Sequence, residues 1–330
     1  MNIRHARNLW VSLVAALTVA TAPSAGLAQE TRGSEFPDLE EDELGVLDVL
    51  KVRLTLAERY IGNADFGSFD ATTHQPEARL RVSMPLSRKA AVRLIGTGRA
   101  LLYDIDGSSN LFGTGVTTDK PFDNLYSWGL RLQGAYVFDP EWTAFSEDER
   151  WLLLLQGGVR ATWEGGSDMG DGLRGAGSIA AGYRLGDRLE VAAGISLGSR
   201  LLRSGVGISP LLEFDWRINE DWKLKSYGTG LQLERTLTDD WIVFTRARLE
   251  GSSFRLADRG GAVGKGSLRV RQVPVGLGVQ WKPLRMLRLR LTAGVVAYNQ
   301  MRLKNENNDI VTRITSDPAP YVAFRVDLRR

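Results

Sequence analysis

Residues able to act as a general base are scarce in this chain. Histidine is the commonest general base, and the sequence has only two, His5 and His74. We interpret His74, in Thr-His-Gln-Pro, as a solvated loop residue and find no histidine on a predicted wall strand. With no cysteine present, neither a disulfide nor a cysteine-based zinc site can form. We therefore expect no catalytic residue, no metal site and no cofactor.

Charged residues are more informative, because they recur at alternate positions within apolar stretches. Successive side chains of a β-strand point to opposite faces, so charges spaced by two share one face. The basic residues predicted on that face are Arg93, Arg99, Arg131, Arg160, Arg174, Arg184, Arg246, Arg248, Arg288 and Arg290. The acidic residues predicted there are Glu190, Glu213, Asp215, Glu234 and Glu250.

The stretch from Leu173 to Arg200 shows which element positions these charges. Apolar or small residues occupy every second position from 173 to 185 and from 189 to 197, and Gly186-Asp187-Arg188 separates the two runs. Alternation on both sides of a tight turn predicts an antiparallel hairpin. Each strand exceeds the roughly 5–6 residues common in soluble sheets. Its length matches the roughly 9–11 residues that a tilted strand needs to cross a bilayer.

The same unit repeats from Lys51 to the end of the chain. We count about fourteen strands if 222–237 forms two strands and about thirteen if it forms one bulged strand. Bacterial single-chain barrels have even strand numbers, so fourteen is favoured and about twelve is the fallback. Trp and Tyr lie at the ends of the apolar faces, as in the aromatic girdle of a membrane barrel. The predicted fold is an all-β, single antiparallel transmembrane barrel.

Connections between the predicted strands mostly alternate between short and long. The short ones are 87–89, 186–188, 219–221, 238–240 and 282–285, and the long ones are 62–76, 104–123, 255–266 and 301–317. Short periplasmic turns and longer outer loops are typical of outer-membrane barrels. We therefore expect both termini on the periplasmic side. Pro274, within a predicted strand, indicates a local defect in its hydrogen-bond ladder.

Residues 1–28 have the pattern of a signal peptide. Arg4 and Arg7 precede an apolar run from 9 to 20, and small residues lead to Ala28. We expect cleavage after Ala28, an acidic periplasmic lead over 29–50, and the barrel over 51–330. The formal charge of +3 falls to about +1 without Arg4 and Arg7, which gives no support for nucleic-acid binding. Mean hydropathy is −0.17, low for a helical membrane protein.

Several segments together resemble an uncharacterised family of Gram-negative outer-membrane β-barrel proteins. They are Gly228-Thr229-Gly230-Leu231 through Thr238-Asp239-Asp240-Trp241, and Asp317-Pro318-Ala319-Pro320 before the last strand. Two positions depart from this family pattern: Arg235 replaces an expected aromatic residue, and the chain ends Leu328-Arg329-Arg330 rather than on an aromatic. The resemblance implies a barrel in the outer membrane and no particular activity.

Two interpretations of the inward charges stay open. Arginine facing lipid near the midplane costs roughly 2–4 kcal/mol, so these residues must face the lumen. They form either a packed lumen in which arginines and carboxylates neutralise one another, or a porin-like aqueous pore whose basic lining prefers anions. The chain is thus expected to be a structural barrel or a small-solute channel.

Three alternatives are less favoured. A transporter of hydrophobic ligands would need an apolar N-terminal plug, and residues 35–50 are acidic. A barrel enzyme acting on lipid would need a histidine on the wall. A soluble periplasmic β-protein would place its apolar residues inside. The expected partners are outer-membrane lipid, the barrel-assembly machinery and periplasmic chaperones during biogenesis, and small solutes.

Overall fold

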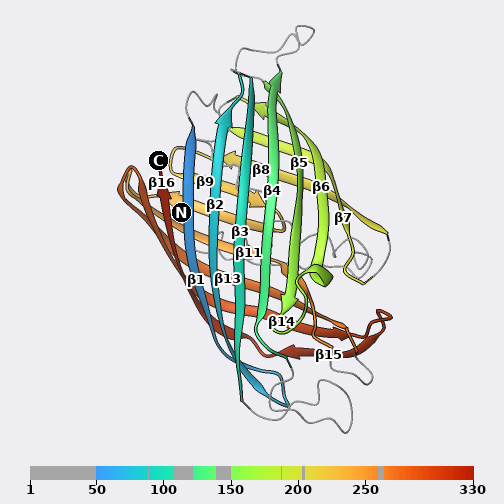
Figure 1. Ribbon diagram of the computed structural model, residues 1–330. Helices are drawn as coiled ribbons and strands as arrows, with labels where there is room; N and C mark the ends of the chain where they lie inside the picture. The colour runs from blue at the N-terminus through green and yellow to red at the C-terminus, as the bar shows by residue number, and fades with distance from the viewer. Residues whose placement is uncertain are drawn as a thin grey trace.

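The computed structural model describes residues 50–87, 89–106, 122–138, 150–186, 188–202, 205–258 and 264–330. These residues form one antiparallel sheet of sixteen strand segments (Figure 1). The segments are β1 (Lys51–Asp65), β2 (Asp70–Pro85), β3 (Ala90–Asp106), β4 (Leu125–Phe138), β5 (Arg150–Glu164), β6 (Leu173–Leu185), β7 (Leu189–Ser199), β8 (Val206–Arg217), β9 (Trp222–Tyr227), β10 (Gly230–Thr236), β11 (Trp241–Arg248), β12 (Glu250–Arg255), β13 (Ser267–Leu284), β14 (Leu287–Lys304), β15 (Ile310–Ser316) and β16 (Ala319–Arg329).

The sheet closes on itself because the first and last strands pair. The register of β1 with β16 runs from Arg53 opposite Arg329 to Ile61 opposite Tyr321. β12 continues β11 beyond Leu249, and β15 and β16 follow one another along β14, so sixteen segments make a closed fourteen-strand antiparallel barrel. The predicted fold class is confirmed. The division of 222–237 into two strands, β9 and β10, is also confirmed.

Alternation along each strand gives the wall an apolar outer face and a polar inner face. On β4 the outward side chains of Trp128, Leu130 and Leu132 are 42%, 39% and 55% exposed, whereas the inward Ser127 is 7% exposed. A barrel in lipid needs this arrangement, since its exterior contacts hydrocarbon. No helix in the described ranges is long and apolar enough to span a membrane.

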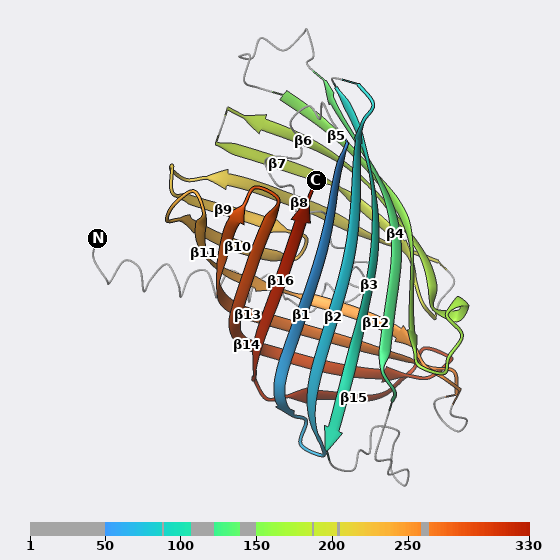
Figure 2. The same ribbon diagram turned by 60° about the vertical axis from the view of Figure 1, so that its left-hand side comes forward.

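The two ends of the barrel differ. The turn end carries Lys51, Arg329 and the short connections 218–221, 237–240 and 285–286, and the loop end carries 66–69, 256–258, 264–266 and 305–309. In both views, β14 and β15 cross the loop end obliquely beneath the steep strands β1–β4 (Figures 1 and 2).

A line of ladder irregularities, which we name the crease, separates the two ends. β1 has a register shift between Ile61 and Ala64, and β13 has one between Gln272 and Pro274. β11 and β12 are interrupted at Leu249, and β15 and β16 at 317–318. These breaks are adjacent, because β14 pairs with Ser316 through Asn299 and with Ala319 through Val296.

Proline and glycine account for part of the crease. Proline has no backbone N–H and interrupts a ladder, and Pro274 and Pro318 both lie on the crease. Gly62 permits close approach there, since a Cβ at this position would lie 3.1 Å from Cγ of Pro320. The ladder defect predicted at Pro274 is therefore confirmed.

Beyond the crease, the two sides of the barrel pack directly on each other. Inward side chains of β12–β16 contact inward side chains of β1–β4 in an apolar cluster. Its members, all 6% exposed or less, are Ile61, Ala64, Phe66, Phe69, Ala71, Leu101, Phe122, Leu125, Phe254, Leu256, Leu268, Val270, Val296, Met301, Leu303, Ala319 and Tyr321. Apolar packing therefore fills the interior at the loop end.

The wall also contains a seam beside β8. β8 pairs with β7 from Val206 to Trp216, but its register with β9 covers only Asp215–Arg217. Among the described residues no strand pairs with the rest of that edge. The backbone N–H of Phe214 donates to Ser226 Oγ across this edge, and the Ser226 hydroxyl donates to the Phe214 carbonyl. The backbone of Pro210, four residues earlier, faces the same edge, because alternate residues of a strand direct their backbone groups to the same side. A proline here removes an N–H that would otherwise lack a partner.

Two predicted long loops are wrong. Only 66–69 connect β1 and β2 where we expected 62–76, and within 301–317 β14 extends to Lys304 and β15 begins at Ile310. The polar side chains of these segments predict loops, but the backbone hydrogen bonds between barrel strands do not depend on side-chain polarity, so the strands continue through them. The signal peptide and its cleavage site, residues 29–49, and most of the connections 104–123 and 139–150 lie outside the described residues.

Candidate functional site

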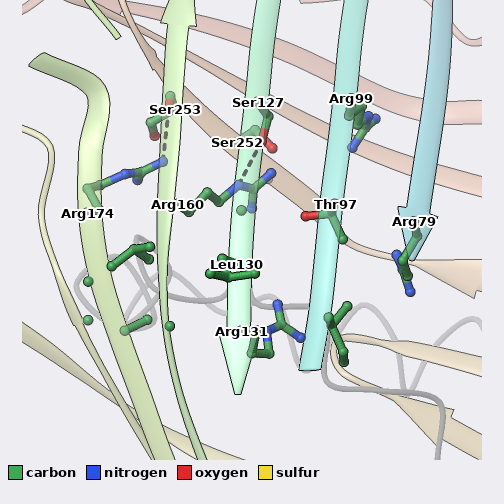
Figure 3. Close-up of a pocket in the computed structure, with 18 of the residues that line it drawn as sticks. Arg79, Thr97, Arg99, Ser127, Leu130, Arg131, Arg160, Arg174, Ser252 and Ser253 are labelled. Carbon is green, nitrogen blue, oxygen red and sulfur yellow. Dashed lines mark hydrogen bonds between the residues drawn. The ribbon is translucent and has the colours of Figure 1, made fainter. Parts of the chain in front are cut away.

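An internal cavity lies in the middle of the barrel, on the turn side of the apolar cluster. Its volume is about 140 Å³, and we name it the central chamber. Ten of its 26 lining residues are charged, eight arginines and two glutamates, and Figure 3 labels five of the arginines. The ten charged residues are Arg79, Arg81, Arg99, Arg131, Arg160, Arg174, Arg248, Arg269, Glu77 and Glu250. Among the described lining residues, arginines therefore outnumber glutamates by eight to two.

Uncharged oxygens hold two of these arginines in place. Arg160 donates from Nε to Ser127 Oγ at 3.0 Å. Arg174 donates from Nη2 to Thr162 Oγ1 at 2.8 Å and to the Ser253 carbonyl at 3.1 Å. Figure 3 shows both side chains reaching from the wall into the chamber. Bonds to hydroxyl and carbonyl oxygens orient each guanidinium group.

A second cavity of about 110 Å³ lies next to the central chamber, between β1–β3, β9–β11, β14 and β16. The two cavities share five lining residues, which we name the partition. These are Glu77, Arg79, Arg99, Arg248 and Glu250. The partition therefore stands between the two parts of the lumen.

Glu250 forms ion pairs with two arginines. Arg59 donates two parallel hydrogen bonds to the Glu250 carboxylate, from Nη1 to Oε2 at 2.7 Å and from Nη2 to Oε1 at 2.9 Å. Arg99 Nη2 lies 3.7 Å from Oε2 and donates to Gln75 at 2.6 Å. Bidentate arginine–carboxylate pairs combine strength with defined geometry.

Charges near the turn end are arranged in pairs. Asp327 is fully buried and contacts Arg53 and Arg325, each at 3.1 Å, and it accepts a bond from Thr55. Three further pairs join neighbouring strands at 2.8–3.2 Å: Lys225 with Glu234, Lys223 with Asp215, and Arg184 with Glu190. Acidic and basic side chains are thus paired here, whereas arginines outnumber glutamates in the lining of the central chamber.

The predicted site residues are distributed over these regions. Arg99, Arg131, Arg160, Arg174, Arg248 and Glu250 line the central chamber, and Arg246 lines the second cavity. Arg93 donates to Ser83 and Gln133 on neighbouring strands. Arg290 donates to Gln280. Arg288 lies opposite Asp327 in the register, and Glu213 and Glu190 line a small pocket beside Tyr227.

Sequence reasoning missed several members of the site. Arg59 continues the inward series begun by Arg53, but it is not among the predicted inward basic residues. Arg269 borders the central chamber from a segment that we had not assigned to a strand. Glu164, which is fully buried, accepts bonds from the backbone N–H groups of Asp123 and Ala257. Such a fold-dependent bond leaves no pattern in the sequence.

His74 corrects another prediction. It lies within β2, on the outer face, rather than in a loop, so a wall strand does contain a histidine. Its ring meets that of Tyr60 edge-on at 5.0 Å, and its Nδ1 lies 3.5 Å from Glu58 Oε1. The β2–β3 ladder omits Gln75 and Pro76, which explains how a strand tolerates this proline.

The surroundings of His74 offer limited chemistry. Its cross-strand neighbours are Tyr60 and Leu102, and neither supplies the serine hydroxyl that a histidine activates in acyl transfer. Among the residues that the structure describes, no group of three or more His, Cys, Asp or Glu side chains is placed to hold a metal ion.

Comparisons with known proteins place the chain beside outer-membrane barrels of very low sequence identity. No family model and no curated protein matches it. An outer membrane channel from Pseudomonas putida F1 aligns with a TM-score of 0.42 and 10% identity, over 89% of this chain and 100% of that one. The toluene transporter TodX of Pseudomonas putida gives 0.36 and 11%, over 91% and 95%. The translocator domain of the autotransporter NalP from Neisseria meningitidis gives 0.36 and 8%, over 88% and 91%.

The architecture itself defines the class of protein. A closed, even-numbered antiparallel barrel with apolar side chains outside and charged side chains inside is the construction of outer-membrane β-barrels. The resemblance noted in the sequence implied the same class.

Proposed function

We propose that this protein is an outer-membrane channel for small anionic solutes, with the central chamber as its selectivity region. The observation that carries the proposal is the lining of that chamber, where eight arginines face two glutamates. Rings of arginine or lysine are the usual lining of pores that pass anions or phosphate. The low dielectric of the surrounding wall strengthens the attraction for anions relative to bulk water.

The location and orientation belong to the same proposal. Exposed apolar side chains around the wall, such as Leu132 and Leu277, support contact with lipid. The short turns, the start of β1 and the end of β16 lie at the turn end, which we assign to the periplasmic side. Export would follow cleavage after Ala28, and assembly would need the barrel-assembly machinery and periplasmic chaperones.

The apolar cluster makes this channel a gated one. It fills the interior at the loop end, and a charged solute cannot cross an apolar constriction without a large desolvation cost. Conduction therefore requires the two packed layers at the loop end to separate. The crease, where six segments change their pairing, is the natural place for that movement.

Conductance in a planar bilayer tests the proposal. Refolded protein is inserted with a tenfold potassium chloride gradient across the membrane, and a heat-dependent shift in gel mobility verifies folding. Brief current steps whose reversal potential favours chloride are expected. Folded protein that is silent, or steps that favour potassium, would contradict an anion channel.

A second candidate function is uptake of hydrophobic ligands, and the seam beside β8 favours it. The outer face there exposes Val206, Ile208 and Leu212 to 60–64%. A wall interrupted at this point offers an apolar molecule a lateral path that avoids the apolar cluster. Accumulation of a radiolabelled aromatic hydrocarbon by proteoliposomes, absent from empty liposomes, would support this candidate.

We also propose that the protein is not an enzyme. The absence of a serine among the cross-strand neighbours of His74 supports this proposal. Release of fatty acid from phospholipid vesicles by the folded barrel, abolished by His74→Asn, would overturn it.

A further inference from the structure

The partition places a carboxylate where a passing anion would bind. Glu250 borders both cavities, and its two oxygens accept the two parallel bonds from Arg59. Arg99 and Arg248 border the same two cavities. An anion that moves between the cavities therefore passes these arginines, and the Glu250 carboxylate is already bound to Arg59 there.

The geometry of this pair resembles ligand recognition. A planar guanidinium fork fits a carboxylate through two parallel bonds, a geometry that a spherical halide cannot reproduce. Arg59 is held on its other side by the ring of Tyr321, with Cζ at 5.8 Å from the ring centroid. The arginine is thus positioned by the wall as well as by Glu250.

Glu250 sits at a break in its strand. Leu249, immediately before it, separates β11 from β12. At Leu249 the ladder is replaced by contacts with the tip of the β9–β10 hairpin: its N–H donates to the Thr229 carbonyl at 3.2 Å, and its carbonyl accepts from the Thr229 hydroxyl. A residue next to such a break can move without unzipping a continuous ladder.

We propose that Glu250 is an internal latch, a tethered carboxylate that occupies the Arg59 site until a carboxylate-bearing solute displaces it. This inference rests on the proposed function and adds to it a substrate class, small dicarboxylates. One carboxylate of such a solute takes the place of Glu250 on Arg59, while the other is held by the arginines of the central chamber. No covalent step is involved.

Single-channel recording of the full barrel tests the latch. The variants are Glu250→Gln, which keeps the size but removes the charge, and the matched control Glu190→Gln. Glu190 pairs with Arg184 at 3.2 Å but borders neither of the two larger cavities. Losing charge-assisted bonds of this kind corresponds to roughly a 10- to 100-fold rise in open probability, which we expect for Glu250→Gln alone.

Succinate and chloride then separate the latch from simple anion attraction. In the wild type, succinate at equal ionic strength is expected to raise the open probability, and in Glu250→Gln it has no further effect. Equal responses of the wild type to succinate and chloride would overturn the assigned substrate class.

The remaining outcomes distinguish the latch from the channel itself. A conducting wild type whose open probability rises in Glu250→Gln but not in Glu190→Gln supports both proposals. A conducting wild type whose open probability is unchanged by Glu250→Gln overturns the latch and leaves the anion channel intact. Silence of all three folded proteins overturns both. Gel mobility before and after heating identifies any variant that has failed to fold.

Discussion

The loop end and the middle of this barrel are built on the same strands but have opposite interiors. At the loop end, Phe254 and Leu268 are fully buried among other apolar side chains. A few residues away along β11 and β12, Arg248, Glu250 and Ser252 line the central chamber. One wall can therefore close the lumen with apolar side chains at one level and select solutes with charged side chains at another, and the crease is the boundary between the two levels.

Truncating the apolar cluster should have the largest effect on stability and should separate the two regions. For Phe254→Ala we expect a loss of about 3–5 kcal/mol in the free energy of unfolding, because a fully buried ring leaves a cavity. Urea titration in lipid vesicles measures the loss. The open probability should rise as well, since this cluster blocks the lumen. A destabilised variant with unchanged open probability would contradict its role as the closure.

The turn end provides the contrasting substitution. Asp327→Asn removes the charge shared by Arg53 and Arg325, and we expect a loss of about 3 kcal/mol, since breaking a buried ion pair leaves uncompensated charge. The same urea titration checks the value. Here the open probability should not rise, because this network lies away from the apolar cluster. A rise equal to that of Phe254→Ala would remove the distinction between the regions.

A smaller effect is expected at the crease itself. Thr229→Val keeps the shape of the side chain but removes the hydroxyl that donates to the Leu249 carbonyl. The loss of one such bond should cost about 1 kcal/mol. Hydrogen exchange at Leu249 and Glu250 should become faster while exchange in β13 near Gln280 stays unchanged. Uniformly faster exchange would show that the crease is not an independent unit.

Much of this fold is readable from the sequence, because alternation is a local property. The hairpin 173–200 and the pair β9–β10 follow from period-two patterns with short polar turns. The inward direction of Arg160 and Arg174 follows from the same parity. Their convergence on one chamber with Arg248 and Arg269 does not, because it depends on how the two sides of the barrel approach each other.

The loop end was harder to predict for a physical reason. Pro274 showed that a ladder breaks, but the sequence does not show that breaks on neighbouring strands align through register. That alignment brings β12 and β13 against β1–β4 and buries Leu268 and Phe254 inside. The prediction for His74 is wrong because the polar segment Thr-His-Gln-Pro resembles a loop, whereas the β2–β3 ladder omits only Gln75 and Pro76.

The measurement that tests the account most directly is the reversal potential of Arg160→Gln/Arg174→Gln under the salt gradient. Both arginines reach into the central chamber from β5 and β6. The matched control is Arg235→Gln, which removes an exposed charge stacked on Trp222. The account predicts a wild-type preference for chloride that the control keeps and the double variant loses, with its potential moving toward zero. An unchanged chloride preference in the folded double variant would contradict the central claim that the arginine-lined chamber selects the solute.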